Sequence, residues 1–490
     1  MKPQYIRMVL TTAFVLTSCI SGVRAQEQQP SDPSQSTDPN APIAPAPTQA
    51  PDDSGRQLPA AAGRGPLLSA GSQADSGQIQ PDSHMLSGVE LMGFGTLDAR
   101  PHVVDVVLGA SESVDTGIVT GAINSVTSFN QGVTYERLEP PYRFTAAYQG
   151  SEAFYHPSTF FNQFSEGGTL AQEVQWKRWI LRLRDDLVLS REATFGNLFT
   201  GSAGLASQTL ALTSVEPTLS PSETILTGTA TRLSNTATGE LDYSPSRRST
   251  LTFAGSYGLL HFFDPTLVGT NSFDGRVGYD LALGAKNSIG IIYDYNFTDF
   301  SATPSQLQTH WFQLAFGRKI TGRFAFQISG GPQLLRLSNF GPVSGQHWSW
   351  GLSGALSYQM TRATGYSLSY FHAVTSGSGV FFGAESDVAT GVATHQFTRV
   401  WSASVNGGYA RNINAAPSPM LSNRFDNWFA GATVGRKLGR EFVFGLSYTF
   451  QQQTNSVGQC PVVNCGLAGG PARHFASVSL QWHPLGIQRE

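Results

Sequence analysis

The chain has few charged residues. Asp, Glu, Lys and Arg make up only 13% of its 490 residues, a share too small to cover the surface of a soluble protein in the usual way. Its formal net charge of −3 also lacks the basic excess that a nucleic-acid-binding surface needs. The low charge argues against an ordinary soluble protein and against a nucleic-acid partner.

Cysteine is equally rare, with 3 in the whole chain. A pair of cysteines without further ligands nearby does not predict a structural zinc site, and the 10 histidines show no metal-binding spacing. No arrangement of Ser, His and acidic residues stands out as a catalytic triad. We therefore predict no metal, no cofactor and no enzymatic activity.

Long apolar runs are missing as well. The segment Met8–Leu16 is apolar but too short to span a bilayer, and no later segment has about 18 uncharged apolar residues in a row. Together with Lys2 and Arg7 and a small-residue site ending at Ala25, it predicts a secretory signal peptide over residues 1–25. A second interpretation stays open, because the residues before Cys19 resemble a bacterial lipobox, in which the cysteine is lipidated.

Residues 26–85 are rich in Pro, Gln, Ser, Asp and Ala and have no apolar periodicity. Such a segment cannot bury enough surface to offset its ordering entropy, so we expect a disordered leader. It acts either as a plain linker or as a tether to a periplasmic partner. Residues 86–490 form the remaining domain.

The stretch from Arg424 to Phe450 shows what that domain is. Large apolar side chains from Phe442 to Phe450 alternate with small or polar ones, which predicts a β-strand with one apolar and one polar face. A second strand precedes it, separated by a tight turn at Lys437–Arg440. Because so little charge is available to solvate the aromatic face, we expect that face to contact lipid.

The same hairpin pattern repeats along the chain. Short turns with a basic residue recur at regular intervals, and longer Gly/Ser/Asn/Pro-rich connections lie between them. The basic residues are Arg248, Lys286, Arg323, Arg362, Arg399 and Arg440. The alternation of short turns and long loops is typical of outer-membrane barrels, with the long loops outside the cell.

We therefore predict an all-β fold, an antiparallel transmembrane β-barrel of about 18 strands, with 16 as the alternative count. The predicted strand ranges include 141–149, 169–177, 179–190, 249–262, 364–375 and 384–396. About eight to ten tilted residues are enough to span the hydrocarbon. The long connections 150–168, 191–233 and 453–471 then all lie at the outer end. Cys460 and Cys465 lie in the last of these loops, where an oxidising compartment favours a disulfide.

Aromatic residues cluster beside the short turns and predict a membrane-interface belt, since such side chains favour the headgroup region. The belt residues are Trp176, Trp179, Phe316, Phe324, Tyr358, Tyr366, Phe397 and Trp401.

Charged residues fall mostly on the small-residue face of the strands, which faces the lumen of a barrel. The lumen candidates are Arg182, Arg184, Asp186, Glu240, Asp242, Arg276, Asp280 and Asp294. They either create a transverse field or serve as polar filling that keeps the wall wet.

The signal, the leader and hairpin segments such as Ser249–Phe262 and Gly365–Phe371 resemble the putative β-barrel porins of Gram-negative bacteria. The resemblance covers residues 86–490 and implies the bacterial outer membrane as location. The last strand, with outward Ala476, Val478, Leu480 and Trp482, is similar to the signal read by the barrel assembly machinery, although residues 483–490 follow it.

Two functional hypotheses stay open. The first is a channel for passive passage of small hydrophilic solutes, since 16 to 18 strands leave an aqueous interior. The second is a non-conducting structural or accessory barrel, as in members of this broad group that are associated with exopolysaccharide export. Neither the solute nor the oligomeric state follows from the sequence.

Overall fold

A computed structural model gives the fold of the chain. It describes residues 102–116, 123–137, 141–156, 162–191, 231–265, 267–301, 303–340, 344–361, 363–375, 381–415, 424–439, 441–455 and 472–484. The strands are β1 (His102–Asp115), β2 (Asn124–Arg137), β3 (Tyr142–His156), β4 (Gln163–Gln175), β5 (Trp179–Ser190), β6 (Arg232–Ser246), β7 (Ser249–Phe262), β8 (Thr270–Ala282), β9 (Asn287–Phe300), β10 (Gln306–Lys319), β11 (Phe324–Ser338), β12 (Gly345–Thr361), β13 (Thr364–Thr375), β14 (Ala384–Gln396), β15 (Trp401–Asn414), β16 (Arg424–Leu438), β17 (Phe442–Asn455) and β18 (Arg473–Trp482). Among these described residues, no helix is long and apolar enough to cross a membrane.

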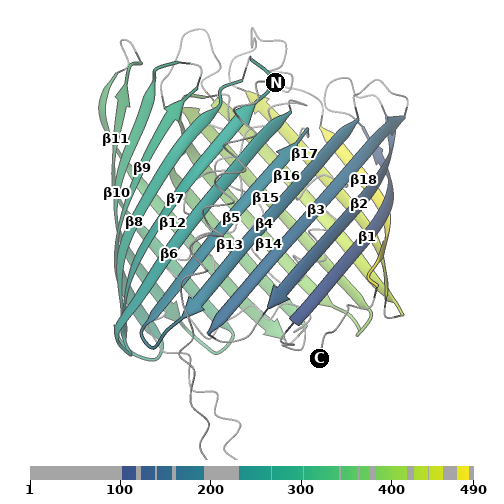
Figure 1. Cartoon of the computed structure of the whole chain (residues 1–490), viewed down its shortest axis with the longest axis horizontal. Helices are drawn as coiled ribbons and strands as arrows, with labels where there is room; N and C mark the ends of the chain where they lie inside the picture. The colour runs from purple at the N-terminus through teal and green to yellow at the C-terminus, as the bar shows by residue number, and fades with distance from the viewer. Residues whose placement is uncertain are drawn as a thin grey trace, which may run out of the picture. The chain divides into compact units, whose positions relative to one another are not determined.

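The strands form one closed antiparallel sheet of 18 strands (Figure 1). Each strand pairs with its neighbour in sequence, and β1 pairs with β18 from Leu108–Trp482 to Asp115–Phe475. Closure pairs the first strand with the last, so the sheet has no edge strand. The predicted all-β barrel and its strand number are confirmed, and the alternative of 16 strands is wrong.

The two faces of the wall differ along every strand, and β18 shows the contrast most clearly. Outward Val478 and Leu480 are 47% and 46% exposed, whereas inward Ser477 and Ser479 are each 4% exposed. Antiparallel pairing places directly opposite residues on the same face, so this alternation carries from strand to strand. The exposed large apolar residues therefore lie on the outside.

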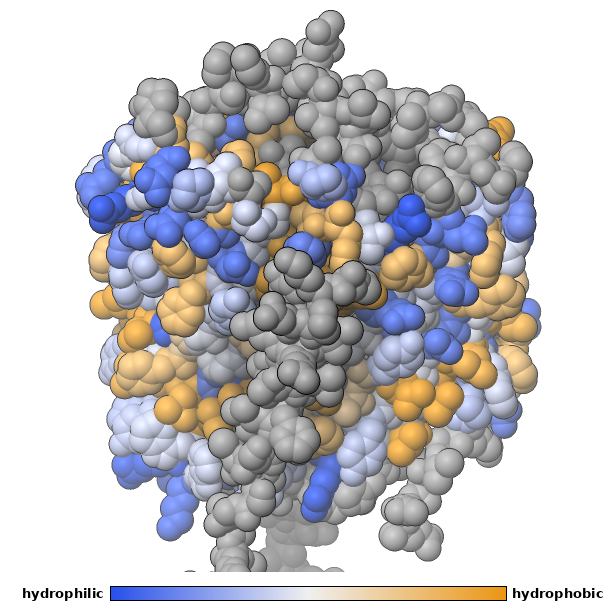
Figure 2. All heavy atoms as spheres, turned by 45° about the horizontal axis from the view of Figure 1, so that its top comes forward, coloured by the Kyte–Doolittle hydropathy of each residue, from blue (hydrophilic) through white to orange (hydrophobic). Residues whose placement is uncertain are grey.

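Figure 2 shows apolar residues spread over the middle of the outer wall, between more hydrophilic rims. Outward side chains such as Ile291, Phe312, Leu314 and Val405 are more than half exposed. A water-facing surface of this kind would be unfavourable, whereas hydrocarbon solvates it. The wall is therefore a lipid-facing surface.

The strands run from 10 residues in β18 to 17 in β12. β3 and β4 extend beyond their predicted ranges, so the connection between them is shorter than predicted. β3 continues to His156 and β4 begins at Gln163, so the long connection predicted over 150–168 is wrong. The segment around Gly150–Glu152 lacks alternation, but pairing with β2 and β4 keeps it extended.

The turn between β16 and β17 depends on Gly439, whose φ is +72°. A left-handed conformation costs a residue with a side chain about 1–2 kcal/mol, which glycine does not incur. Glycine therefore allows β16 to turn sharply back into β17, as predicted from the stretch between Arg424 and Phe450.

The predictions for the ends of the chain and for two long loops lie outside the described residues. They are the signal peptide over 1–25, lipidation at Cys19, the leader over 26–85 and the Cys460–Cys465 disulfide. Most of the connection 191–233 also lies outside, since β5 ends at Ser190 and β6 begins at Arg232.

Candidate functional site

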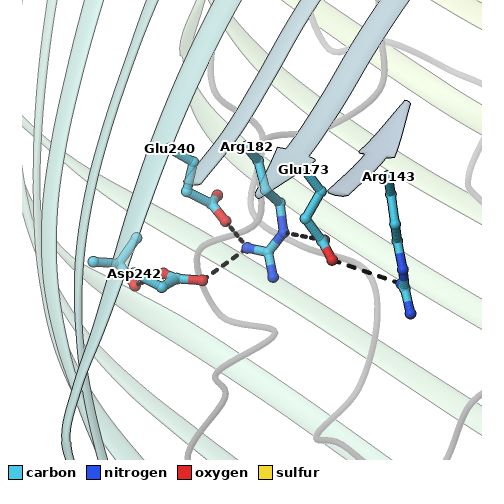
Figure 3. Close-up of polar contacts among 6 residues, drawn as sticks. Arg143, Glu173, Arg182, Glu240 and Asp242 are labelled. Carbon is cyan, nitrogen blue, oxygen red and sulfur yellow. Dashed lines mark hydrogen bonds and ion pairs between the residues drawn. The ribbon is translucent and has the colours of Figure 1, made fainter. Parts of the chain in front are cut away.

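The candidate site is the charged part of the inner wall. Strand pairing places Arg182 of β5 opposite Glu240 of β6 and Glu173 of β4, so all three share the inward face. Figure 3 shows them projecting from neighbouring strands into the barrel interior. The eight lumen candidates from the sequence all occupy inward positions.

Arg182 is the centre of an ion-pair network of five residues. Its Nε lies 3.1 Å from Oε2 of Glu173, and its Nη1 contacts Oδ2 of Asp242 at 2.7 Å and Oε1 of Glu240. Arg143 of β3 reaches the other oxygen of Glu173 at 3.6 Å (Figure 3). One guanidinium thus neutralises carboxylates from two flanking strands, which fixes the position of all of them.

A second arginine of β5, Arg184, pairs with a carboxylate on its own strand. Nε of Arg184 lies 2.5 Å from Oδ2 of Asp186, which also accepts a hydrogen bond from Oγ1 of Thr169 at Oδ1, 2.7 Å away. Arg182, Arg184 and Asp186 are consecutive inward residues on β5, so this strand carries a short ladder of charge along the barrel axis.

A third group lies on β8 and β9. Arg276 contacts Asp294 through two nitrogens, at 3.1 Å from Nη2 to Oδ2 and through Nε, and Gln313 of β10 also donates to Asp294. Asp274 accepts hydrogen bonds from Nδ2 of Asn296 at 2.6 Å and Oγ of Ser256 at 3.3 Å. These carboxylates are held by fixed donors.

Asp280 is different. It is 2% exposed, and within the described part of the chain neither of its carboxylate oxygens has a hydrogen-bond partner. The hydroxyl of Thr250, directly opposite on β7, is also buried without one. An unpartnered carboxylate in a poorly solvated position is unfavourable, so Asp280 marks a place where the wall can accept a donor.

The charged side chains occupy only one part of the wall. We call the inward face of β3–β9 the charged arc; its charged residues are Arg143, Glu173, Arg182, Arg184, Asp186, Arg232, Glu240, Asp242, Asp274, Arg276, Asp280 and Asp294. The inward face of the described β10–β17, the neutral arc, carries no carboxylate and no arginine, and its charged residues are Lys319 and Lys437 beside the short turns. Ser, Thr, Asn, Gln and Gly predominate there. The interior is therefore electrostatically asymmetric.

Sequence reasoning missed four members of the charged arc. Arg143, Glu173, Arg232 and Asp274 were not among the lumen candidates, although they obey the same alternation. Asp274 precedes Arg276 by two residues on β8, and Glu173 pairs with Arg182 across β4 and β5. Extending the alternation along each strand would have found them.

The end of the barrel with the longer connections contains an apolar group, which we call the mouth cluster. Phe300 of β9 lies 5.3 Å from Phe382 between ring centroids, and Phe340 lies 6.0 Å from Phe382. The cluster consists of Val268, Phe300, Leu307, Leu335, Leu337 and Val374, with Phe340, Phe382 and Ala415 packed against them.

The connection between β13 and β14 reaches across this mouth. Phe382 contacts Phe300 of β9, while its neighbour Phe381 contacts Phe425 of β16 with ring centroids 5.4 Å apart. β9 and β16 are separated in the wall by six strands, so residues 381–382 can touch both only from inside the barrel. The part of the mouth between these strands is thus narrowed by this connection.

The eight aromatic residues predicted as an interface belt lie beside the short turns. Trp176, Trp179, Tyr358, Tyr366 and Phe397 are exposed, and the other three are partly buried. Several contact one another across strands, as Tyr358 does with Phe324 at 6.0 Å and with Tyr366 at 6.2 Å. The arrangement fits a headgroup position.

Among the described residues, no group of three or more His, Cys, Asp or Glu side chains is placed to hold a metal ion.

No protein-family model matches the chain, and no curated protein matches it. Among solved structures, Pseudomonas aeruginosa OprD is similar at 8% identity, with a TM-score of 0.38 and coverage of 79% of this chain and 96% of that one. P. aeruginosa OccK11 (OpdR) is similar at 11% identity and a TM-score of 0.38, covering 83% and 100%. P. aeruginosa OpdK with vanillate is similar at 8% identity and a TM-score of 0.40, covering 79% and 99%. Similarity at such low sequence identity and TM-score does not assign a function to this chain.

The location follows from the barrel itself. Its strand number is even, its wall is closed and its exterior is apolar, which together are the properties of an outer-membrane barrel. The chain is a protein of the bacterial outer membrane, as predicted, and its fold is the one that the resemblance to porins implied.

Proposed function

We propose that the barrel is a channel for passive passage of small hydrophilic solutes. The observation that carries the proposal is the inner wall, where Ser, Thr, Asn and Gln line one arc and a hydrogen-bonded ladder of charge lines the other. Opposed polar and charged faces orient the dipole of a passing solute and keep the wall wetted.

Carboxylates outnumber arginines in the charged arc, so the channel prefers cations. Asp274 and Asp280 contribute most to this preference, because the arginines neutralise Glu173, Asp186, Glu240, Asp242 and Asp294 directly. In this barrel a single charged arc shares the interior with the neutral arc.

A second candidate, the non-conducting accessory barrel, is favoured by a different observation. Some small inward side chains, including Ser128, Thr252 and Asn427, have none of their surface exposed, whereas the wall of a wide empty pore is wetted. In this alternative the barrel serves as a structural component, in association with exopolysaccharide export.

Single-channel recording of the refolded full-length protein in planar bilayers tests the proposal. Folding is first verified by electrophoresis, since a closed barrel resists dodecyl sulfate until heated. A channel gives ohmic current steps with a cation-selective reversal potential in a salt gradient. Folded protein that leaves the bilayer silent would reject the channel in favour of the accessory barrel.

The proposal includes no catalytic role, because most charged groups of the charged arc are engaged in ion pairs with one another. It includes the barrel assembly machinery as a partner. The outward face of β18, with exposed Val478, Leu480 and Trp482, supports that partner.

A further inference from the structure

Strands β12 and β13 part from each other near the mouth. Their pairing stops at Leu352 with His372, yet both strands continue. β12 stays paired with β11 as far as Gly345, and β13 stays paired with β14 as far as Thr375. The wall thus contains two strand edges side by side without a backbone ladder between them. We call residues 349–351 and 373–375 the β12–β13 seam.

In the described part of the chain, no other pair of neighbouring strands separates in this way. Elsewhere each ladder continues until one strand ends, as between β14 and β15, where it reaches Ala384 at the start of β14. Unpaired backbone groups in a membrane wall cost several kcal/mol each. The seam is therefore a specific local feature of the wall.

Side chains hold the seam together in place of the ladder. The backbone N–H of Val374 donates to Oε1 of Gln333 at 3.3 Å, and Oγ of Ser349 donates to Oε1 of Glu385 at 3.2 Å. The Trp350 ring stacks on His372 with centroids 4.0 Å apart. Side-chain contacts can be exchanged without breaking the rest of the barrel, so the seam is the part of the wall that can open.

His372 is also fixed on the side of β14. Its Nδ1 lies 2.7 Å from Oδ1 of Asp387, and its Nε2 lies 3.2 Å from Oε1 of Glu385. The two carboxylates thus fix the imidazole of His372, and stacking of Trp350 on this ring links β12 to β13. Release of Trp350 is the smallest change that would part the two edges.

The surfaces beyond the seam are apolar on both sides, although the polar contacts of Ser349, His372 and Glu385 cross the seam itself. On the outside, Trp348 and Trp350 are 69% and 52% exposed. On the inside lies the mouth cluster, to which Val374 of the seam itself belongs. The seam also lies in the neutral arc, away from the ion-pair network. An apolar molecule would meet an apolar surface on the outer wall and another at the mouth, separated only by the side-chain contacts of the seam.

We propose that the β12–β13 seam is a lateral portal through which small apolar molecules pass between the outer leaflet and the barrel mouth. Trp350 is its outer latch, and the mouth cluster is the surface that receives the molecule. This route is separate from the axial passage of hydrophilic solutes along the charged arc.

Cross-linking the seam tests the portal. In the full-length protein with Cys460→Ser and Cys465→Ser, Ser349→Cys and Glu385→Cys place thiols on β12 and on β14, which is paired with β13 beside the seam. A short bis-methanethiosulfonate then joins the two thiols across the seam. Cells producing this variant are then given N-phenyl-1-naphthylamine, an apolar dye that fluoresces after entering the cell envelope. We expect uptake to fall, on cross-linking, to the rate of cells lacking the protein, and to recover on reduction.

The matched control is Ala393→Cys with Val405→Cys, a directly paired outward position on the β14–β15 ladder. Cross-linking there should leave dye uptake unchanged. Uptake that is equally fast with the seam cross-linked would overturn the portal. The same cross-linked protein should keep its single-channel conductance, so a silent bilayer would reject the proposed channel without bearing on the portal.

A single substitution tests the portal without cross-linking. Trp350→Ala should accelerate dye uptake about fivefold, the factor that a stacked ring pair is commonly worth. Trp348→Ala is the control, because Trp348 is exposed on the same strand but outside the seam. Heat-dependent gel mobility verifies that both variants fold. Equal uptake by folded Trp350→Ala and the parent would contradict the role of Trp350 as a latch.

Discussion

Arg473 on the last strand forms a buried ion pair with Asp115 on the first. Its Nε donates to Oδ1 at 2.9 Å and its Nη2 to Oδ2 at 2.7 Å, although the residues are 358 positions apart in the chain. The side chains are only 6% and 3% exposed. The pair lies beside Asp115–Phe475, the last paired position between β1 and β18, and therefore fastens the strands that close the barrel.

Breaking this pair should destabilise the closed barrel strongly. Asp115→Ala leaves the buried guanidinium of Arg473 without its carboxylate, and removing one partner of a buried ion pair costs about 3–5 kcal/mol. We expect the midpoint of denaturant unfolding in lipid vesicles to fall accordingly. The charge-swapped double variant, Asp115→Arg with Arg473→Asp, should recover part of the loss. An unchanged midpoint for Asp115→Ala would show that backbone pairing alone closes the barrel.

Two carboxylates of the charged arc should respond in opposite ways to the same substitution. Asp280 has no hydrogen-bond partner among the described residues, so Asp280→Asn removes an unsatisfied charge and should raise the free energy of unfolding by about 1–3 kcal/mol. Asp294 is paired with Arg276, so Asp294→Asn should lower it by about 1–3 kcal/mol. Denaturant titration of both variants gives the comparison.

The same variants distinguish an effect on stability from an effect on ion selectivity. Asp280→Asn should also shift the reversal potential of the channel towards anions, since it removes the least neutralised carboxylate of the arc. If Asp280→Asn destabilised the protein as much as Asp294→Asn, an unrecognised donor would have to satisfy Asp280.

The strand pattern was predictable because a barrel wall has two different solvents. Lipid selects large apolar side chains on one face, and the interior selects small or polar ones on the other, so the period of two is nearly unbroken from β6 to β18. Strands such as β13 and β14 begin and end at the residues that the pattern predicts. Charged residues in the interior follow from the same rule.

The features of the fold and site that the strand pattern does not predict depend on contacts between segments distant in the chain. Alternation does not reveal that β13 leaves β12 at His372, because that depends on Phe381 and Phe382 meeting Phe425 and Phe300 across the mouth. Nor does a local pattern reveal that Asp280 lacks a partner while Asp294 has several.

Two glycines in equivalent short turns should differ in their tolerance of a side chain. A methyl group at Gly439 or at Gly322 would meet no atom within 4 Å, but only Gly439 has a left-handed backbone, with φ of +72°. Gly439→Ala should therefore cost about 1–2 kcal/mol, and Gly322→Ala should be nearly neutral. Refolding yield and unfolding midpoint measure both. Equal losses would mean that packing, rather than backbone strain, determines the effect.

Leu446 and Ser447 are neighbours on β17 and face opposite solvents. Leu446 is 44% exposed on the outer wall and is paired with Val478, while Ser447 is paired with inward Ser477. An arginine on the lipid face near the bilayer midplane costs about 2–4 kcal/mol, whereas an inward arginine stays among polar groups. Leu446→Arg should therefore lose much of its folded yield in vesicles, and Ser447→Arg should fold nearly as well as the parent.

Loss of yield alone does not identify lipid as the solvent, because a buried apolar core would reject Leu446→Arg as well. Single cysteines at positions 444, 445, 446 and 447, in the Cys460→Ser and Cys465→Ser background, can each carry an environment-independent fluorophore. Brominated lipid should quench the label at 444 and 446 and spare it at 445 and 447, because only the outward positions contact acyl chains. Equal quenching at all four positions would remove the alternation from which the lipid-facing wall is inferred, whereas quenching at none would place the outer face against protein.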